Sequence, residues 1–170
     1  MSQSTAQHRA EAPKALRVSI MTVSDTRTLE TDESGALIAQ YLESAGHTVV
    51  DRVIVPDDPE RMRPILLSWS QKGDVDAALL TGGTGITSRD QTFETVSALL
   101  TKPMPGYGEL FRMLSYAEIG PATILSRAVG GLMGQMLVFV MPGSKAAVRL
   151  AMEKILAPEL PHFVREVRKR

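Results

Sequence analysis

The stretch LLTGGTGITSRD (residues 79–90) brings together residue types that can bind a phosphate and a metal ion. Its glycines, Gly82, Gly83 and Gly85, tolerate positive φ angles and let a ligand approach the backbone closely. Free N–H groups in such a loop can hold a phosphate, and the carboxylate of Asp90 can bind Mg²⁺ beside it. The same residues also suit a tight strand-to-helix turn in which Asp90 caps the next helix, and the pattern alone favours neither interpretation.

This stretch matches neither of the two common nucleotide-binding fingerprints. The Walker A pattern requires a lysine after its last glycine, and no lysine stands there. The dinucleotide pattern G-x-G-x-x-G requires a third glycine at the position where this chain has Ser88. A nicotinamide-dependent oxidoreductase is therefore disfavoured.

Three further polar stretches follow apolar segments elsewhere in the chain: TVSD (22–25), VPDD (55–58) and MPGS (141–144). In open α/β sheets, ligands bind outside the carboxyl ends of the strands. We therefore expect these stretches and TGGTG (81–85) to meet at one edge of a sheet and to line a single pocket. This convergence carries more weight than any one of the stretches.

The carboxylates and the first serine at this edge each have a structural and a functional interpretation. If Asp57 and Asp90 share the edge, they suit a metal held by two carboxylates and substrate phosphates. Asp57 or Asp58 equally suits the cap of the helix that follows. Ser24 and Asp25 can satisfy a turn, or they can contact a nucleotide or a pterin.

The turn PGS (142–144) precedes a helical pattern, and it has the same two interpretations. Ser144 suits the N-cap of that helix, while the helix start leaves backbone N–H groups for a second anion. Arg89 suits either a phosphate contact or a solvated surface position.

The chain has no cysteine, so thiolate catalysis and cysteine-ligated metals are excluded. Its three scattered histidines indicate neither a metal site nor a catalytic triad.

Alternating strand and helix patterns are expected to position these stretches. Apolar, β-branched segments predict strands at 15–25, 48–55 and 76–80, and helical periodicity predicts helices at 32–47 and 57–73. Further predicted helices are 92–100 (capped by Asp90 or Thr92), 104–120 (helical around 109–116 after initial turn residues) and 145–169 (interrupted at Pro158), with two strands in 122–144 around the glycines at 130, 131 and 134. This order predicts a single three-layer α/β/α domain with a mostly parallel mixed sheet.

The composition suits one globular domain. The chain has 170 residues, of which 44% are hydrophobic, and 19 basic side chains balance 19 acidic ones. The zero net charge argues against a general nucleic-acid binder and is compatible with an oligomer. No apolar stretch reaches the length of a membrane helix, and no signal peptide is indicated, so we expect a cytoplasmic protein. Residues 1–14 are expected to form a disordered tail before a domain at 15–170.

Taken together, these stretches resemble the MoaB/MogA family of molybdenum cofactor biosynthesis proteins, which is related to the gephyrin G domain. The resemblance covers about residues 15 to 165. It rests on TVSDTRTLETDESG (22–35), VPDD (55–58), TGGTGITSRD (81–90), PGYGELFRMLSYAEIG (105–120), ILSRA (124–128) and MPGS (141–144). The segment GELFRMLSYAEIG points to the MoaB branch.

The resemblance implies a molybdopterin-binding domain and, in active members, molybdopterin adenylyltransferase activity. ATP would donate AMP to the terminal phosphate of molybdopterin in the presence of Mg²⁺, and pyrophosphate would leave. Asp57 and Asp90 would be the catalytic, metal-positioning residues. The nucleotide would contact Ser24, Asp25, Gly82, Gly83, Thr84 and Gly85, and the pterin would contact Ser126, Arg127, Pro142, Gly143 and Ser144. The family also implies homotrimers, or homohexamers in the MoaB branch, working with other molybdenum cofactor biosynthesis proteins.

Three residues depart from the family pattern. Ser88, Phe93 and Lys145 stand where many members have proline. Because proline near a helix start preorganises the backbone, its loss would loosen the loop that carries Asp90. Members of the MoaB branch also differ in whether they catalyse the reaction. The alternative function is therefore a non-catalytic pterin-binding or scaffolding oligomer in the same pathway.

Overall fold

The computed structural model describes residues 12–169, so residues 1–11 of the predicted tail lie outside the described part. At its centre is a six-stranded sheet with the strand order β2-β1-β3-β6-β5-β4. The pairs β1–β2, β1–β3 and β3–β6 are parallel, whereas β5 runs antiparallel to β6 and β4 runs antiparallel to β5. The predicted mostly parallel mixed sheet is confirmed.

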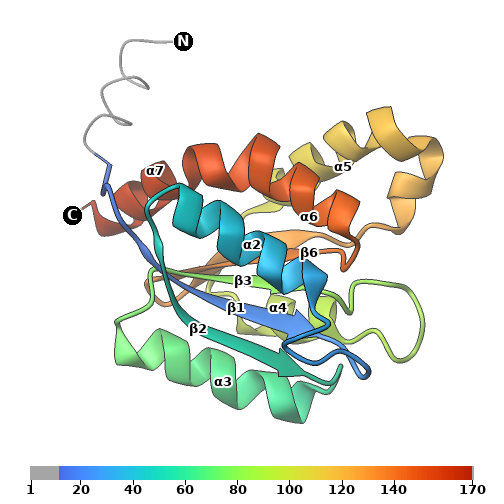
Figure 1. Cartoon of the computed structure of the whole chain (residues 1–170), viewed down its shortest axis with the longest axis horizontal. Coiled ribbons are helices and arrows are strands. Elements are labelled where there is room, and N and C mark those ends of the chain that lie inside the picture. Colours follow the sequence, from blue (N-terminus) through green and yellow to red (C-terminus); the bar gives the residue numbers. More distant parts are fainter. Residues whose placement is uncertain (1–11, 170) are drawn as a thin grey trace.

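Helices cover both faces of this sheet (Figure 1). The strands are β1 (Arg17–Val23), β2 (Thr48–Val55), β3 (Ala77–Thr81), β4 (Lys102–Pro103), β5 (Val129–Met133) and β6 (Met136–Met141). The helices are α2 (Glu33–Ser44), α3 (Pro59–Lys72), α4 (Thr92–Leu99), α5 (Pro105–Ile119), the 3₁₀ helix η1 (Gly120–Leu125), α6 (Lys145–Ala151), the π-helix η2 (Met152–Leu156) and α7 (Ala157–Arg168). Helices α2, α5, α6 and α7 pack on one face, and α3 and α4 pack on the other.

Alternating side chains of the central strands supply a hydrophobic core to each face. In β3, Leu79 belongs to the core beneath α2, α6 and α7, whereas Leu80 belongs to the core beneath α3 and α4. All residues of β3 are buried, as expected for a parallel strand with helices on both sides. Because this packing holds β3 in place on both faces, it also fixes the start of the glycine-rich loop, which follows the carboxyl end of β3.

The second half of the chain corrects three local predictions. Gly130 and Gly131 lie inside β5, and only Gly134, at φ +64°, lies in the turn. A Cβ on Gly130 would come within 2.5 Å of the Phe139 ring, so close packing against β6 accounts for this glycine. Helix α5 begins directly at Pro105, a residue type favoured in the first helical turn. Instead of a break at Pro158, the chain widens into the π-helix η2 just before it.

Within residues 12–169, no helix has the length and hydrophobicity required to cross a membrane.

Candidate functional site

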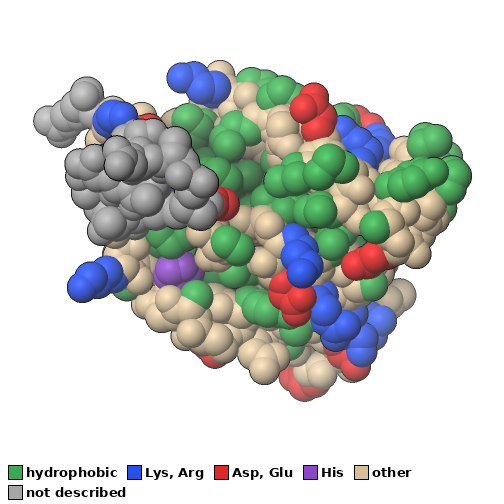
Figure 2. All heavy atoms as spheres, turned by 90° about the horizontal axis from the view of Figure 1, so that it is seen from above, with side chains coloured by type: hydrophobic (Ala, Val, Ile, Leu, Met, Phe, Trp, Pro, Cys, Tyr) green, Lys and Arg blue, Asp and Glu red, His purple; other side chains and the backbone are tan. Residues whose placement is uncertain are grey.

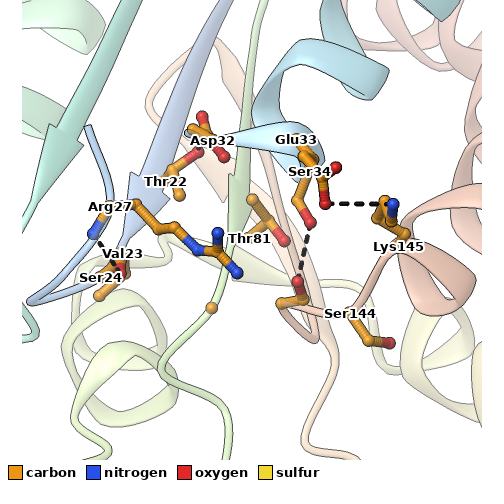
Figure 3. A pocket seen from close by; sticks show the side chains of 12 residues that line it. Thr22, Val23, Ser24, Arg27, Asp32, Glu33, Ser34, Thr81, Ser144 and Lys145 are labelled. Carbon is orange, nitrogen blue, oxygen red and sulfur yellow. Dashed lines mark hydrogen bonds and ion pairs between the residues drawn. The ribbon is translucent and has the colours of Figure 1, made fainter. Parts of the chain in front are cut away.

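The carboxyl ends of β1, β3 and β6 open onto a cavity of about 330 Å³ (Figure 3). Its side walls are the first turns of α2 and α6. Four of the predicted site residues line it: Ser24, Gly82, Gly143 and Ser144. The stretches TVSD, TGGTG and MPGS therefore meet at one cavity, because parallel strands end at the same edge of the sheet.

Glycines allow the loops around the cavity to approach one another closely. Gly82 has φ +104°, and a Cβ there would overlap the carbonyl oxygen of Val23. A Cβ on Gly143 would lie 3.3 Å from the Cα atom of Gly82. Larger residues at either position would separate the strand ends, so these glycines set the width of the cavity floor.

The two serines of the cavity have the structural roles expected of them and still face the cavity. Ser24 Oγ accepts hydrogen bonds from the backbone N–H groups of Thr26 and Arg27, at 3.3 and 3.2 Å. Ser144 is the N-cap of α6, and its Oγ accepts the N–H of Ala147 at 3.2 Å. A turn or capping role and a ligand contact are compatible at both positions.

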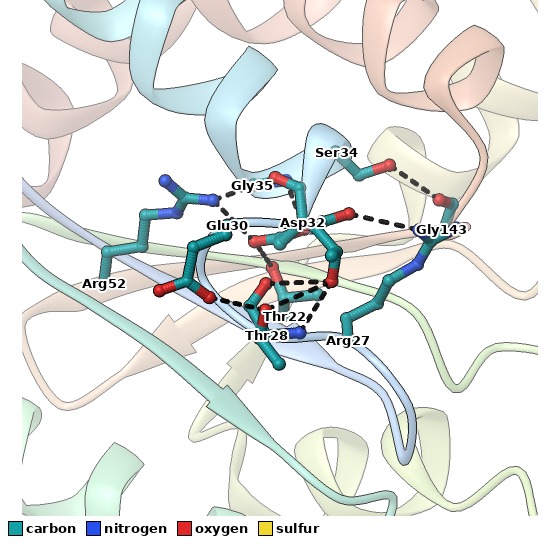
Figure 4. Close-up of polar contacts among 10 residues, drawn as sticks. Thr22, Arg27, Thr28, Glu30, Asp32, Ser34, Gly35, Arg52 and Gly143 are labelled. Carbon is teal, nitrogen blue, oxygen red and sulfur yellow. Dashed lines mark hydrogen bonds and ion pairs between the residues drawn. The ribbon is translucent and has the colours of Figure 1, made fainter.

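A buried network around Asp32 was not anticipated as part of the site (Figure 4). Asp32 caps α2 by accepting the N–H of Gly35 at 2.9 Å, and its side chain is 1% exposed. Its Oδ2 also accepts from the Thr22 hydroxyl at 2.8 Å and from Arg52 at 2.9 Å. The sequence signal for Asp32 was its position as a capping residue at a helix start, but nothing in the sequence predicted Arg52 as its partner.

Two cations at the cavity were also missed. Figure 3 shows Arg27 extending into the cavity, and the hydrogen bond from its side chain goes to the backbone carbonyl of Thr31 at 3.1 Å. Lys145, the first residue of α6, forms an ion pair with Glu33 at 3.1 Å. Both members of that pair are more than half exposed, so the pair is weak.

VPDD (55–58) was expected to line the same cavity, but none of its residues does; Asp57 lies at the start of α4 instead. Its Oδ1 accepts the backbone N–H of Gln91 at 3.1 Å and the Thr92 hydroxyl at 3.3 Å. A Cβ on Gly83 would overlap Asp57 Oδ2, so this glycine makes room for the carboxylate. Burial, reinforced by the nearby charges of Asp90 and Asp25, raises the pKa of Asp57 despite these hydrogen bonds.

Asp90 turns back into its own loop. Its Oδ2 accepts the backbone N–H of Thr87 at 2.9 Å and the Thr87 hydroxyl at 2.5 Å. The Thr87 hydroxyl, together with backbone N–H groups, holds the pKa of Asp90 below its ordinary value. The predicted cap of α4 by Asp90 or Thr92 is wrong: Gln91 is the N-cap residue and has no side-chain capping bond. Asp57 takes that role because the loop after β2 brings it there.

Arg127 fastens the glycine-rich loop to α4. Its Nε donates to the carbonyl of Thr84 at 3.1 Å, and its Nη2 donates to the carbonyl of Asp90 at 3.3 Å. It also forms an ion pair with Glu94, and its guanidinium lies 5.0 Å from the centre of the Phe93 ring. This distance suits a cation–π contact between Arg127 and Phe93 of α4.

Some of the remaining predicted residues lie around a second, smaller cavity of about 200 Å³ next to the first, but Gly83, Gly85 and Arg127 line neither cavity. It is lined by Thr84, Ser126, Pro142 and Ser144, and Ser144 also lines the first cavity. The Oγ of Ser126 is buried there without a hydrogen-bond partner among the described residues. Outside both cavities, Asp25 forms an exposed ion pair with Arg89.

The fold and this edge define an α/β protein whose ligand cavity lies at the carboxyl ends of parallel strands. A family model described as "Probable molybdopterin binding domain" matches residues 19–162. The chain belongs to the MoaB/MogA family of molybdenum cofactor biosynthesis proteins, on its MoaB branch.

Several relatives are similar over nearly the full length of this chain. "Molybdenum cofactor biosynthesis protein B" of Bacillus anthracis is 53% identical over 165 residues, which are 96% of this chain and 98% of that protein. A crystal structure of Molybdenum cofactor biosynthesis protein B superposes with a TM-score of 0.90 at 53% identity, covering 94% of this chain and all of that one (100%). The crystal structure of the tungsten cofactor synthesizing protein MoaB from Pyrococcus furiosus gives 0.82 at 38% identity, covering 93% and 100%.

Proposed function

We propose that this protein transfers AMP from ATP to the terminal phosphate of molybdopterin, with Mg²⁺ bound and pyrophosphate as the second product. The observation that carries the proposal is the cavity at the carboxyl ends of β1, β3 and β6, built from glycines, hydroxyls and helix starts. The proposal agrees with the family, whose members include proteins named for molybdenum cofactor biosynthesis.

The charge of Arg27 supports phosphate binding in this cavity. No carboxylate within residues 12–169 pairs with its guanidinium, which lies at the cavity and donates to a backbone carbonyl. Ser24 and Ser144 add hydroxyl groups to the same cavity. Asp32 also lines the cavity, but it is paired with Arg52, so its charge is offset.

The glycine-rich loop supports close approach of a phosphate to the backbone. Gly82 and Gly83 have φ angles of +104° and +63°, a conformation that other residues rarely adopt. We infer that nucleotide phosphates lie against Gly82–Gly85, with Ser24 and Asp25 on the same side.

Asp57 and Asp90 fit a Mg²⁺ ion shared with phosphates. Two carboxylates offer the hard oxygen ligands that Mg²⁺ prefers, and Asp90 is close enough to Asp57 to raise its pKa. Among residues 12–169, no three histidine or acidic side chains are grouped to hold a metal alone, so phosphate oxygens would complete the coordination. When bound, Mg²⁺ would neutralise charge that develops on the phosphates.

The transfer requires no nucleophile from the protein. A terminal phosphate oxygen of molybdopterin attacks the α-phosphorus of ATP, the bond from that phosphorus to the bridging oxygen breaks, and pyrophosphate leaves. The residues of this chain align the two substrates and stabilise charge, which are the main contributions a protein makes to such reactions. We infer that the pterin lies toward the smaller cavity, near Ser126, Arg127 and Pro142–Ser144.

Exposed apolar side chains support assembly into a homotrimer or homohexamer. Figure 2 shows such side chains gathered at the end of the molecule that α5 and η1 form. Met113, Tyr116 and Ile124 are 64%, 59% and 77% exposed in the single chain. Large exposed apolar patches are typical of protein interfaces. Sedimentation velocity measures the mass directly, and a monomer at micromolar concentration would contradict the assembly.

A turnover assay tests the proposed function. Purified protein is mixed with ATP, Mg²⁺ and molybdopterin, and pyrophosphate release is followed together with formation of the adenylylated pterin. We expect release that requires both substrates and stops on chelation of Mg²⁺. Tight molybdopterin binding without any release would favour the alternative, a pterin-binding scaffold, which the internal hydrogen bonds of Asp57 and Asp90 also allow.

A further inference from the structure

Two hydroxyl groups of the larger cavity have already donated their only proton. Thr22 Oγ1 lies 2.8 Å from the carboxylate oxygen Oδ2 of Asp32, and Ser34 Oγ lies 2.8 Å from the carbonyl oxygen of Gly143. Carboxylate and carbonyl oxygens only accept, so each hydroxyl must be the donor in its pair. Toward the cavity, Thr22 and Ser34 can therefore offer only lone pairs.

The rest of this wall is also made of acceptors. Asp32 lines the cavity beside Thr22, and Glu33 lies next to Ser34 at the start of α2. We call Thr22, Asp32, Glu33 and Ser34 the acceptor wall. Asp32 is held in place by Arg52 and by the Gly35 N–H, so the direction of the Thr22 bond is fixed by buried groups.

Ser24 and Ser144, which also line the cavity, have the opposite polarity. Ser24 Oγ accepts two backbone N–H groups, and Ser144 Oγ accepts one. Both keep their hydroxyl proton for a ligand, and Arg27 adds a charged donor. A phosphate fits beside Ser24, Ser144 and Arg27, whereas the side chains of the acceptor wall offer it only lone pairs and carboxylates, of which Glu33 is paired with Lys145.

We propose that the acceptor wall selects a neutral part of the ligand that carries hydrogen-bond donors. This inference rests on the proposed function and specifies how its cavity discriminates between ligands. We assign this position to one of two groups: the ribose 2′- and 3′-hydroxyls of the nucleotide, or the 2-amino group of the pterin. An analogue that lacks the donor leaves the acceptor lone pairs of Thr22 and Ser34 without a partner, which costs affinity at a desolvated site.

Calorimetric titration of the wild-type protein with two matched ligand pairs distinguishes the sources. The first pair is ATP and 2′,3′-dideoxy-ATP, and the second is pterin and lumazine, in which oxygen replaces the 2-amino group. The member that lacks the group in question, the ribose hydroxyls or the 2-amino group, should bind at least about fivefold more weakly in the pair whose group lies at the acceptor wall. The other pair should differ little.

Variants at the wall connect this preference to particular side chains. Ser34→Ala removes a partly exposed acceptor and should reduce the preference to below about twofold, mainly by weakening the donor-bearing ligand. Thr22→Val also removes an acceptor, but at a buried position. If Thr22→Val does not fold, Ser34→Ala alone tests whether the acceptor wall causes the preference. The matched control is Thr101→Val, because the Thr101 hydroxyl likewise donates to a carbonyl, that of Leu132, at 3.1 Å, outside the cavity. It should retain the full preference.

The outcomes separate this inference from the proposed function. Equal affinity of ATP and its dideoxy analogue, with no difference between pterin and lumazine, overturns the acceptor wall even in a protein that releases pyrophosphate. A preference that Ser34→Ala leaves unchanged overturns it as well. A preference that depends on Ser34 supports it even in a protein without turnover. A protein that binds neither ATP nor pterin contradicts both.

Discussion

The Asp57 carboxylate accepts the backbone N–H of Gln91 at 3.1 Å and so caps α4 from 34 positions away in the chain. This bond joins the loop after β2 to the end of the glycine-rich loop. Because the same carboxylate is our candidate Mg²⁺ ligand, its structural and functional contributions have to be separated by experiment.

Asp57→Asn should separate them. The amide oxygen retains the bond from Gln91 but removes the charge, so we expect pyrophosphate release to fall by about 100-fold or more. Burial raises the pKa of Asp57, so folding favours its protonated form. Asp57 therefore stabilises the folded state fully at pH values below its ordinary pKa of 3.8. This stabilisation is lost as the pH rises through the raised pKa of the folded state.

The asparagine variant should therefore unfold at the same temperature as wild type or about 1–3 °C higher at pH 7. The difference should vanish below about pH 4, where Asp57 is protonated. Thermal unfolding followed by circular dichroism measures this. Asp58→Asn is the control, because asparagine caps a helix as well as aspartate does, and its turnover should stay within about twofold. Unchanged turnover in Asp57→Asn would exclude a metal role for Asp57.

Thr87→Val should move the titration of Asp90. The Thr87 hydroxyl is the main cause of the lowered pKa of Asp90, so its removal should shift that pKa toward the ordinary value. A carboxylate whose pKa is lowered by folding stabilises the folded state at pH values above its ordinary pKa. This stabilisation is lost as the pH falls through the lowered pKa of the folded state. The variant should thus be less stable than wild type at pH 7 and similar to it in strong acid. Carbon-13 NMR titration of the carboxylates measures the shift, and Thr87→Ser, which keeps the hydroxyl, should not show it.

Gly83→Ala should displace the Asp57 carboxylate. A Cβ there would overlap both Asp57 Oδ2 and Thr92 Oγ1, and the φ angle of +63° adds strain. We expect a loss of stability of about 2–4 kcal/mol and no measurable turnover. Gly46→Ala is the matched control, because Gly46 has φ +81° and open space around its Cβ position, so only about 1–2 kcal/mol of strain should appear. Urea unfolding compares them, and equal losses would show that the contact with Asp57 is unimportant.

Arg52→Met should destabilise the cavity wall. The Arg52–Asp32 ion pair has side-chain exposures of 24% and 1%, so the variant leaves a buried carboxylate unpaired. We expect a loss of about 2–4 kcal/mol in urea unfolding. Arg17→Met breaks an ion pair whose members are 53% and 43% exposed, and it should cost less than about 1 kcal/mol. If the two variants cost the same, the Asp32 network does not support the wall as we describe.

Much of the fold could be predicted from local pattern. The strand predicted at 48–55 has the bounds of β2, since alternating β-branched residues and the proline after it are local signals. The helix at 32–47 was predicted from helical periodicity, and the helix after Ser144 from its capping residue, because both signals act over a few neighbouring positions. Gly130 was misplaced because its reason for being glycine is the Phe139 ring on the neighbouring strand.

For the site, the sequence by itself determined which residue types are available: glycines after β3, carboxylates at 57 and 90, and serines at two strand ends. Only the tertiary structure decided how they are used. Asp57 caps α4, Arg127 holds the glycine-rich loop, and Arg52 balances Asp32. The physical reason is that hydrogen bonds and ion pairs act over a few ångströms in space. Sequence patterns record neighbours along the chain, whereas these partners are brought together by the order of strands in the sheet.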